Sequence, residues 1–288
     1  MTMRLIEIRR FPVKSMLGET PRGARVETSG VVGDRAHALV DIETGKVASA
    51  KRPRLWGSLL GFSAYYNDHP GAGEPLVITL PDGTALHSEQ PDFDERLSGA
   101  IGRQVKLVAA PEQGAGYEDE WLDIEGMAPQ EFIQATQTST SEDGNPVSTL
   151  PVGMMAPGTF QDVAPVTIMT TAALRRAGEL QPGSQWDPRR FRPNLLLEVE
   201  GTGFIENEWV GRQLRVGEVV FSVAAPIPRC VMTTLPQEDL SADREILRTV
   251  ARHNRVDVAG TGVFACLGAY AGILDAGRVA VGDEIEVL

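Results

Sequence analysis

The sequence has 288 residues, of which 42% are hydrophobic, which is enough to build one large or two modest domains around apolar cores. Its formal net charge of −12 argues against general nucleic-acid binding, and it contains no apolar run of about 18 residues that could span a membrane. Only two cysteines and four histidines are present, which excludes a disulfide framework, an iron–sulfur cluster with four cysteine ligands and a Cys-rich zinc site.

The first part of the chain, residues 1–110, is predicted to be a β-rich module. Its start, MTMRLIEIRRFPVK, alternates charged and aliphatic residues, which predicts a strand and lacks the apolar block of a signal peptide. We therefore expect a cytoplasmic protein. Two stretches have the alternation and the turn residues of hairpins, at residues 34–51 and 76–87. A short helix is expected over residues 92–101 and a further strand over residues 104–109.

Residues 111–160 differ from their surroundings and are predicted to form an acidic insertion rich in Gly and Pro. No Lys or Arg occurs between Lys106 and Arg175, whereas ten acidic residues do. An insertion of this length is either a functional lid or a disordered loop, and it could also dock a basic partner. A helical patch is expected within it over residues 121–136.

The last part, residues 161–288, is predicted to be a second β-dominated module, so that the whole chain is mainly β with a few helices, in the α+β class. Thr170 or Thr171 can cap a helix that runs to about residue 179, because a threonine hydroxyl accepts from free N–H groups at a helix start. Further elements are strands over residues 166–169, 194–200 and 213–224, an amphipathic helix from Ser241, and a closing hairpin over residues 277–288.

One of the two cysteines, Cys230, lies in an unusual setting, the segment PIPRCVMTTLP. Arg229 precedes it, and the hydroxyls of Thr233 and Thr234 follow. A thiolate is a nucleophile and a metal ligand, and a neighbouring cation favours it, but a free cysteine is also often a small buried apolar residue. The other cysteine, Cys266, has only apolar neighbours, and we expect it to be structural.

Basic residues gather at the ends of predicted strands. Three arginines occur in DPRRFRPN, which ends at Asn194 just before an aliphatic strand. Arginine forks suit phosphate and carboxylate oxygens, although the cluster could instead be solvated and paired with the acidic insertion. Lys14 and Ser15 in FPVKS are a weaker candidate for holding an anion. Arg35 and Lys51 lie at the two ends of the first predicted hairpin, so pairing would bring them together.

These segments together resemble the MOSC family, in which an N-terminal MOSC β-barrel domain precedes the MOSC domain, named for the C-terminal domain of molybdenum cofactor sulfurase. The segments that carry the resemblance are FPVKS, GDRAHALVD, APVTIMTTAAL, FRPNLLLEV, PIPRCVMTT and GRVAVGDEI. They cover nearly the whole chain. Within the family, the chain is similar to the mitochondrial amidoxime-reducing component and its bacterial relatives. The resemblance implies a β-barrel-type MOSC domain packed with an N-terminal β-rich domain.

The resemblance also implies a molybdenum cofactor, a metal-bound pterin that carries a phosphate, held between the two modules. Cys230 would be a direct molybdenum ligand beside the two pterin sulfurs, with Arg229 next to it, and a soft thiolate suits this metal. The residues that would hold the pterin and its phosphate are Lys14, Ser15, Arg35, Lys51, Thr170, Thr171, Arg192, Asn194, Thr233 and Thr234.

Two functions remain open at this stage. The first is an oxidoreductase that reduces N-oxygenated compounds such as hydroxylamines, amidoximes or hydroxylated base analogues. Its electrons would come from a separate donor protein of the reductase, ferredoxin or haem type, because this sequence has no cysteines for a ferredoxin-like domain. The second is a carrier of the molybdenum cofactor, or of persulfide sulfur on Cys230. A scaffold that binds a different anion is a third possibility.

Overall fold

The computed structural model describes residues 3–71, 73–109, 111–112 and 114–288; residues 1–2, 72, 110 and 113 lie outside this description, and so does the predicted module boundary at residue 110. The α-helices are α1 (Pro53–Trp56), α2 (Phe93–Ile101), α3 (Gln130–Thr136), α4 (Thr171–Leu180) and α5 (Glu245–His253). Short 3₁₀ helices are η1 (Gly57–Gly61), η2 (Pro188–Arg190), η3 (Ile205–Trp209) and η4 (Val231–Thr234).

The first eleven strands are β1 (Met3–Ile8), β2 (Gly23–Glu27), β3 (Gly30–Val31), β4 (Ala38–Asp41), β5 (Ser63–Tyr66), β6 (Leu76–Thr79), β7 (Ala85–His87), β8 (Val105–Val108), β9 (Gly116–Glu120), β10 (Gln137–Thr140) and β11 (Pro146–Pro151). The remaining strands are β12 (Val166–Thr170), β13 (Leu195–Glu198), β14 (Gln213–Val216), β15 (Val219–Pro228), β16 (Arg255–Asp257), β17 (Val263–Asp275), β18 (Gly277–Ala280) and β19 (Glu284–Val287).

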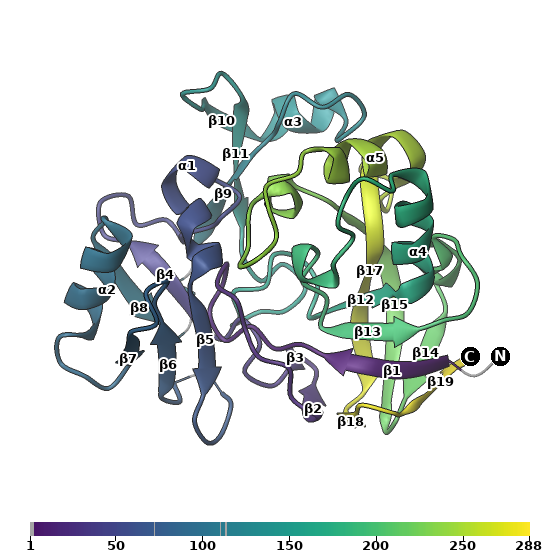
Figure 1. Ribbon diagram of the computed structural model, residues 1–288, viewed down its shortest axis with the longest axis horizontal. Helices are drawn as coiled ribbons and strands as arrows, with labels where there is room; N and C mark the ends of the chain where they lie inside the picture. Colours follow the sequence, from purple (N-terminus) through teal and green to yellow (C-terminus); the bar gives the residue numbers. More distant parts are fainter. Residues whose placement is uncertain (1–2, 72, 110, 113) are drawn as a thin grey trace.

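Seven strands of the described chain form a closed barrel, which lies on the right in Figure 1. Their order is β12-β13-β1-β19-β14-β15-β17, and the pairing of β17 with β12 closes the ring. Closure pairs each of these strands on both sides, and alternate side chains then fill the interior. Leu5, Ile168 and Phe221 belong to this apolar core and are fully buried. The predicted fold, mainly β with a few helices, is confirmed.

The first strand of the sequence belongs to this barrel. β1 pairs antiparallel with β13, where Arg4 lies opposite Glu198, and with β19 on its other side. Beyond β1 the chain crosses to the N-terminal sheets, where the backbone N–H of Lys14 donates to the carbonyl of His37, 2.9 Å away. The crossing segment therefore brings Lys14 and Ser15 to the junction between the barrel and the N-terminal sheets.

Two small sheets, β4-β8 and β5-β6-β7, make up the left-hand part of the molecule in Figure 1. The hairpin predicted over residues 76–87 is β6 and β7, with Ile78 opposite Leu86. The helix predicted over residues 92–101 is α2. It ends at Gly102, which has the left-handed conformation that glycine adopts without strain. Side chains of Trp56 and Leu97 pack with these sheets into one core.

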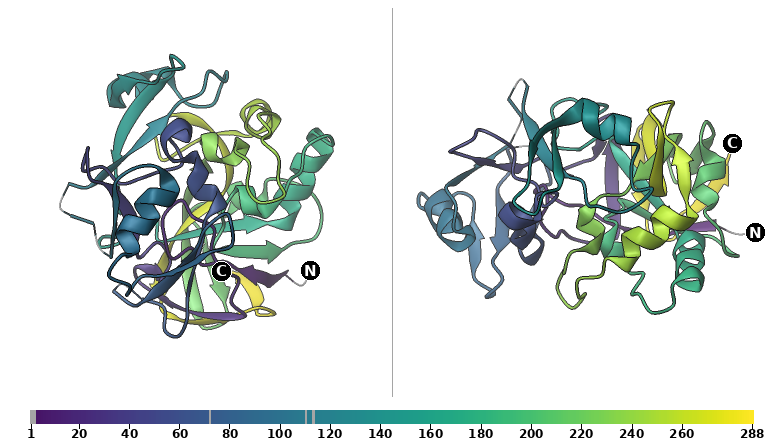
Figure 2. Two further views of the ribbon diagram at one scale, coloured as in Figure 1. Left: turned by 60° about the vertical axis from the view of Figure 1, so that its left-hand side comes forward. Right: turned by 90° about the horizontal axis from the view of Figure 1, so that it is seen from above.

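The acidic insertion contains an antiparallel sheet in the order β10-β11-β9, with α3 beside it, and these elements project from the upper part of the molecule in Figures 1 and 2. The patch predicted to be helical over residues 121–136 is helical only in α3. Strand β9 faces the basic residues that follow β4. Its carboxylates form ion pairs with them: Glu118 with Lys46, Asp119 with Lys51 and Glu120 with Arg52.

The prediction of a closing hairpin over residues 277–288 is wrong. Both strands form, but β18 pairs with β2 and β19 pairs with β1 and β14. A turn in which the N–H of Asp283 donates to the carbonyl of Ala280 joins them. The two strands diverge because the side chains of Val279 and Ile285 both pack in the barrel core. Each strand reaches this core beside a different neighbouring strand.

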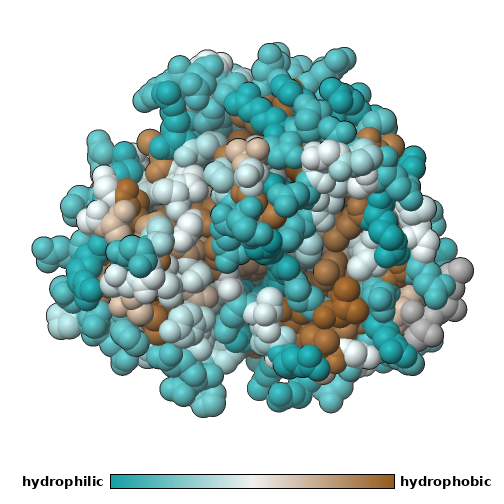
Figure 3. Space-filling view, viewed as in Figure 1, coloured by the Kyte–Doolittle hydropathy of each residue, from teal (hydrophilic) through white to brown (hydrophobic). Residues whose placement is uncertain are grey.

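The surface is predominantly polar. The face shown in Figure 3 is mostly hydrophilic, with apolar side chains in separate patches, as expected for a chain of high net charge. Across the described residues, the helices are too short or too polar to cross a bilayer.

Candidate functional site

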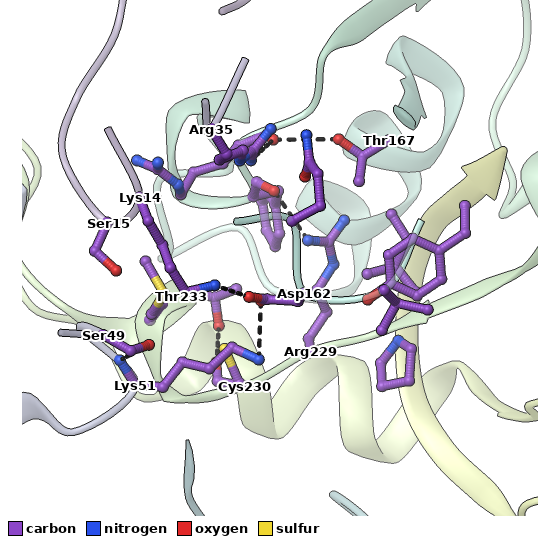
Figure 4. A pocket seen from close by; sticks show the side chains of 18 of the residues that line it. Lys14, Ser15, Arg35, Ser49, Lys51, Asp162, Thr167, Arg229, Cys230 and Thr233 are labelled. Carbon is purple, nitrogen blue, oxygen red and sulfur yellow. Dashed lines mark hydrogen bonds and ion pairs between the residues drawn. The ribbon is translucent and has the colours of Figure 1, made fainter. Parts of the chain in front are cut away.

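A cavity lies where the barrel meets the N-terminal sheets, and most of the predicted site residues line it (Figure 4). We call it the central cavity. Its lining comes from segments that are far apart in the sequence, including the crossing segment after β1, the turn before β4, the end of β15 and strand β17. The predicted residues that line it are Lys14, Ser15, Arg35, Lys51, Arg192, Arg229, Cys230 and Thr233.

Cys230 lies between β15 and η4, directly before η4, and is half-buried at the cavity wall. The hydroxyl of Thr233 donates to the backbone carbonyl of Cys230 at 3.0 Å, which fixes the turn and leaves the sulfur facing the cavity lining. Burial raises the pKa of the Cys230 thiol to about 11, and Lys51 is the cation that opposes this shift. Cys266 is fully buried among apolar side chains, as predicted.

Lys51 is the cation that most lowers the pKa of the Cys230 thiol, and Arg229, expected beside the thiol from sequence, also interacts with it by charge. The Arg229 guanidinium turns toward the barrel wall, where Nε donates to the carbonyl of Leu267 at 2.7 Å and Nη1 to that of Phe191 at 2.9 Å. Burial lowers the pKa of Arg229 to about 10. Its remaining nitrogen, Nη2, is buried and has no hydrogen-bond partner.

Arg35 and Arg192 form a second group of cations on the wall, where both guanidinium groups lie over the ring of Phe11, 4.5 and 4.0 Å from its centroid. Arg192 donates from Nη1 to the carbonyl of Met16 at 2.8 Å, while its Nη2 is buried without a partner. Burial lowers the pKa of Arg192 to about 9, and the neighbouring Arg35 acts in the same direction. Two like charges are thus held together at this wall.

Three of the lining residues have a backbone conformation that L-residues rarely adopt. The φ angles are 66° at Ser15, 44° at Arg35 and 53° at Arg192. Positive φ at a residue with a side chain costs about 1–3 kcal/mol and persists only where the surroundings impose it. Such strain gathers at binding and catalytic sites, and here three of the predicted residues share it.

The lysines occupy the part of the wall nearest Cys230. Lys14 and Lys51 both form ion pairs with the carboxylate of Asp162, the latter at 3.1 Å (Figure 4). Strand β9 supports them from behind: the Tyr117 ring lies beneath both ammonium groups, 4.4 Å from that of Lys14 and 4.7 Å from that of Lys51. Asp119 adds a second carboxylate to Lys51 at 2.9 Å. These lysines are therefore already neutralised by the chain itself.

Four predicted residues lie outside the lining and have structural roles. The Thr170 hydroxyl caps α4 by accepting from the N–H of Ala173, and the Thr171 hydroxyl bonds the backbone of Val199. The Thr234 hydroxyl donates to the carbonyl of Val231 within η4.

Asn194, the fourth, is fully buried behind the wall. Its side-chain oxygen accepts from the backbone N–H and the hydroxyl of Thr167, both at 3.0 Å, and its amide nitrogen donates to the carbonyl of Arg9 at 3.2 Å. Asn194 therefore positions Thr167, which does line the cavity.

The three arginines of DPRRFRPN separate into three environments. Arg189 points outward and forms ion pairs with Asp187, Glu238 and Asp239. It is therefore a solvated, ion-paired arginine, which was the alternative to an anion site. Arg190 is buried and donates to backbone carbonyls, including that of Ser241 at 2.7 Å. Of the three, Arg192 lines the cavity and has a buried nitrogen, Nη2, without a hydrogen-bond partner.

Sequence reasoning missed several lining residues, of which Asp162 is the most important. It is one of the ten acidic residues between Lys106 and Arg175, just beyond the predicted insertion, and it lies between the cavity lysines. Its context in TFQDVAPV does not set it apart, because Asp123 in WLDIEG also lies between aliphatic residues. The other missed polar residues are Ser49, Gln161, Thr167, Arg190 and Tyr270.

The donor set fits an anionic cofactor that also needs a sulfur ligand. A buried guanidinium N–H without a partner is costly, and an oxyanion of a bound group would satisfy it. Arg192 and Arg229 each have such a nitrogen in the lining, while Cys230 supplies a half-buried thiol in the same cavity. Within the described residues, no cluster of His, Cys, Asp and Glu could hold a metal ion by itself. A metal here would therefore need ligands from the cofactor.

Comparisons with known proteins identify the family of the chain. Residues 2–122 match the MOSC N-terminal beta barrel domain, and residues 157–286 match the MOSC domain. The chain is 24% identical over 258 residues to a molybdenum cofactor sulfurase from Drosophila grimshawi; the match covers 86% of this chain and 30% of that protein. The chain thus spans less than a third of the length of this relative.

Two solved structures are weakly similar to this chain. The YuaD protein from Bacillus subtilis has a TM-score of 0.44 and 8% identity, with 100% of this chain and 96% of that chain covered. YiiM from Geobacillus stearothermophilus has a TM-score of 0.31 and 14% identity, with 43% and 54% covered.

Proposed function

Because the chain belongs to the MOSC family, which is associated with the molybdenum cofactor, we propose that the central cavity binds this cofactor and that the protein reduces N-oxygenated compounds. One observation carries the proposal. The half-buried sulfur of Cys230 shares a cavity with Arg192 and Arg229, each of which has a buried guanidinium nitrogen without a partner.

In this proposal the residues of the wall divide the work of binding. Cys230 would supply the protein ligand to the metal through its sulfur, and Thr233 holds the turn that presents it. Arg35 and Arg192 would hold the anionic groups of the pterin, and Thr167 lines the cavity from the neighbouring strand. When bound, a molybdenum cofactor supplies two-electron oxidation and reduction.

The proposed reaction cleaves an N–O bond. It consumes two electrons and two protons, leaves an N–H group on the substrate and releases the oxygen as water. Lys14 is a candidate proton donor, since burial lowers its pKa and its ammonium group lies in the lining. The electrons would come from a separate donor protein, because two cysteines cannot bind a cluster that needs four.

A carrier function is the second candidate, and the similarity to a molybdenum cofactor sulfurase over 86% of this chain favours it. In this alternative Cys230 would carry persulfide sulfur, or the cavity would hold the mature cofactor and pass it on. The same cavity wall would bind the cofactor in both functions. Reduction of a substrate therefore distinguishes the two functions, and cofactor binding does not.

The test is elemental analysis and pterin fluorescence of protein purified from a molybdenum-replete host, with a reduction assay on an amidoxime driven by a reduced viologen dye. The proposal expects about one molybdenum per chain and turnover in the wild type, neither in Cys230→Ser, and both in Cys266→Ser. Bound cofactor without reduction of amidoximes, hydroxylamines or hydroxylated bases supports the carrier. Cyanide-labile sulfur on Cys230 without metal supports the persulfide form. Absence of bound cofactor, of reduction and of cyanide-labile sulfur rejects both functions.

A further inference from the structure

The central cavity is partly filled by its own side chains. The free space within the lining is about 100 Å³. Sites for small organic ligands typically measure about 300–1,000 Å³, so a ligand of that size enters only if part of the wall moves. Which part moves follows from how firmly each lining side chain is held.

The cations of the wall are firmly held. Arg192 and Arg229 are anchored by hydrogen bonds to backbone carbonyls, and their side chains are buried. Lys51 has the Asp119 carboxylate at 2.9 Å and the Tyr117 hydroxyl at 3.3 Å in addition to Asp162. Lys14 likewise keeps the carbonyl of Phe160 at 3.1 Å. Both lysines would therefore stay in place if Asp162 moved away.

Asp162 is held much less. Its recorded side-chain partners are the two ammonium groups, and 29% of its side chain is exposed, against 6% for Lys14 and 12% for Lys51. It lies in residues 152–165, which have neither helix nor strand and connect β11 to β12. A small rotation toward solvent would release both ammonium groups without breaking any sheet.

We propose that Asp162 is a displaceable counter-ion, which an anionic ligand replaces on the ammonium groups of Lys14 and Lys51 while Tyr117 and Asp119 keep these groups in position. Asp162 then determines how tightly the cavity binds anions, because every anion competes with a carboxylate that is already there. For the molybdenum cofactor this inference rests on the proposed function, but for anion binding in general it does not.

The experiment uses the full chain purified without molybdenum, and inorganic pyrophosphate as the probe. Isothermal titration calorimetry at constant ionic strength gives the affinity of the wild type, of Asp162→Asn and of Asp119→Asn. We expect Asp162→Asn to bind pyrophosphate about tenfold more tightly, because the competing charge is gone while the side-chain shape remains. Asp119→Asn should bind no more tightly than Asp162→Asn, and Lys51 should lose its fixed position.

The controls separate this inference from a general charge effect. Asp143→Asn, an exposed acid near Arg54 on the far end of the insertion, should match the wild type. Equal or weaker binding by Asp162→Asn, including no binding by any variant, overturns the inference. If Asp162→Asn does not fold, Asp162→Ser is measured instead and must show the same gain. Molybdenum content of the wild type tests the proposed function alone, so either can fail without the other.

Discussion

Arg192 donates a hydrogen bond from Nη1 to the backbone carbonyl of Met16, 2.8 Å away and 176 positions earlier in the sequence. This bond joins the loop before β13 to the segment that crosses from the barrel to the N-terminal sheets. The same guanidinium group leaves Nη2 unpartnered in the lining of the central cavity. One side chain thus links the two parts of the fold and offers a donor to a ligand.

The first prediction concerns this double role. Arg192→Met should lower the cofactor content of the purified protein about tenfold or more, because it removes a charged donor from the wall. It should also lower the free energy of unfolding by about 1–2 kcal/mol through the lost bond to Met16. Arg189→Met is the matched control, since Arg189 lies in the same run but pairs with surface acids. Equal cofactor content in the two variants contradicts the assignment.

The sequence predicted those parts of the fold that depend on local chemistry. Helix α4 forms where Thr170 can cap it, and the hairpin of β6 and β7 forms around its turn residues. Contacts between distant segments were not accessible in the same way. The two strands over residues 277–288 read as a hairpin because they are adjacent, whereas closure of the barrel gives each a different partner.

In the candidate site, too, local sequence features could be interpreted and contacts between distant segments could not. Cys230 could be singled out by its type and setting, whereas Lys14 was a weak candidate until the family resemblance was considered; both line the cavity. Tyr117 and Asp119 could not, because their surroundings in the sequence are those of a polar surface loop. Only the pairing of β9 with β11 and its packing against Lys51 reveal that they are buried.

A second prediction tests Tyr117 as the platform for the lysines. Tyr117→Leu removes the ring beneath both ammonium groups and should lower the free energy of unfolding by about 2–4 kcal/mol, together with cofactor content. Tyr117→Phe keeps the ring and loses only the hydroxyl that lies 3.3 Å from Lys51, so it should cost about 1 kcal/mol. Chemical denaturation and metal analysis of both variants check this. A Phe variant as impaired as the Leu variant would show that the hydroxyl, not the ring, matters.

A third prediction concerns pH and the buried carboxyl group of Glu206. Burial raises its pKa to about 7, although the N–H of Thr170 donates to one oxygen at 2.7 Å; the other oxygen has no partner. The folded protein therefore holds a proton that the unfolded chain releases near its ordinary pKa. The free energy of unfolding should fall as the pH rises from about 4.5 to about 7, by on the order of 2–3 kcal/mol, and then level off.

The matched variants make this prediction specific to Glu206. Glu206→Gln keeps an oxygen for Thr170 but cannot ionise, so urea midpoints should show it more stable than the wild type at pH 8 and similar at pH 4.5. Glu208→Gln, in the same 3₁₀ helix but exposed, should follow the wild-type profile. A Glu206→Gln profile parallel to that of the wild type would falsify this role.

The last prediction uses two glycines of β17 that differ in backbone conformation and in their surroundings. At Gly268 φ is 79°, and an added Cβ would meet the carbonyl oxygen of Ile168 at 2.7 Å and Nη2 of Arg229 at 3.0 Å. At Gly272 an added Cβ meets nothing within 4 Å. Gly268→Ala should therefore lower the free energy of unfolding by about 1–3 kcal/mol and displace the unpartnered nitrogen of Arg229 from the cavity wall.

Because that displacement removes a donor for an anionic ligand, Gly268→Ala should also lose cofactor, whereas Gly272→Ala should keep wild-type content and nearly wild-type stability. Thermal unfolding and molybdenum analysis of the pair measure the two effects separately. If Gly268→Ala loses stability but retains full cofactor, then the backbone at this position tolerates strain without moving Arg229. That outcome would contradict the predicted coupling between this glycine and cofactor binding.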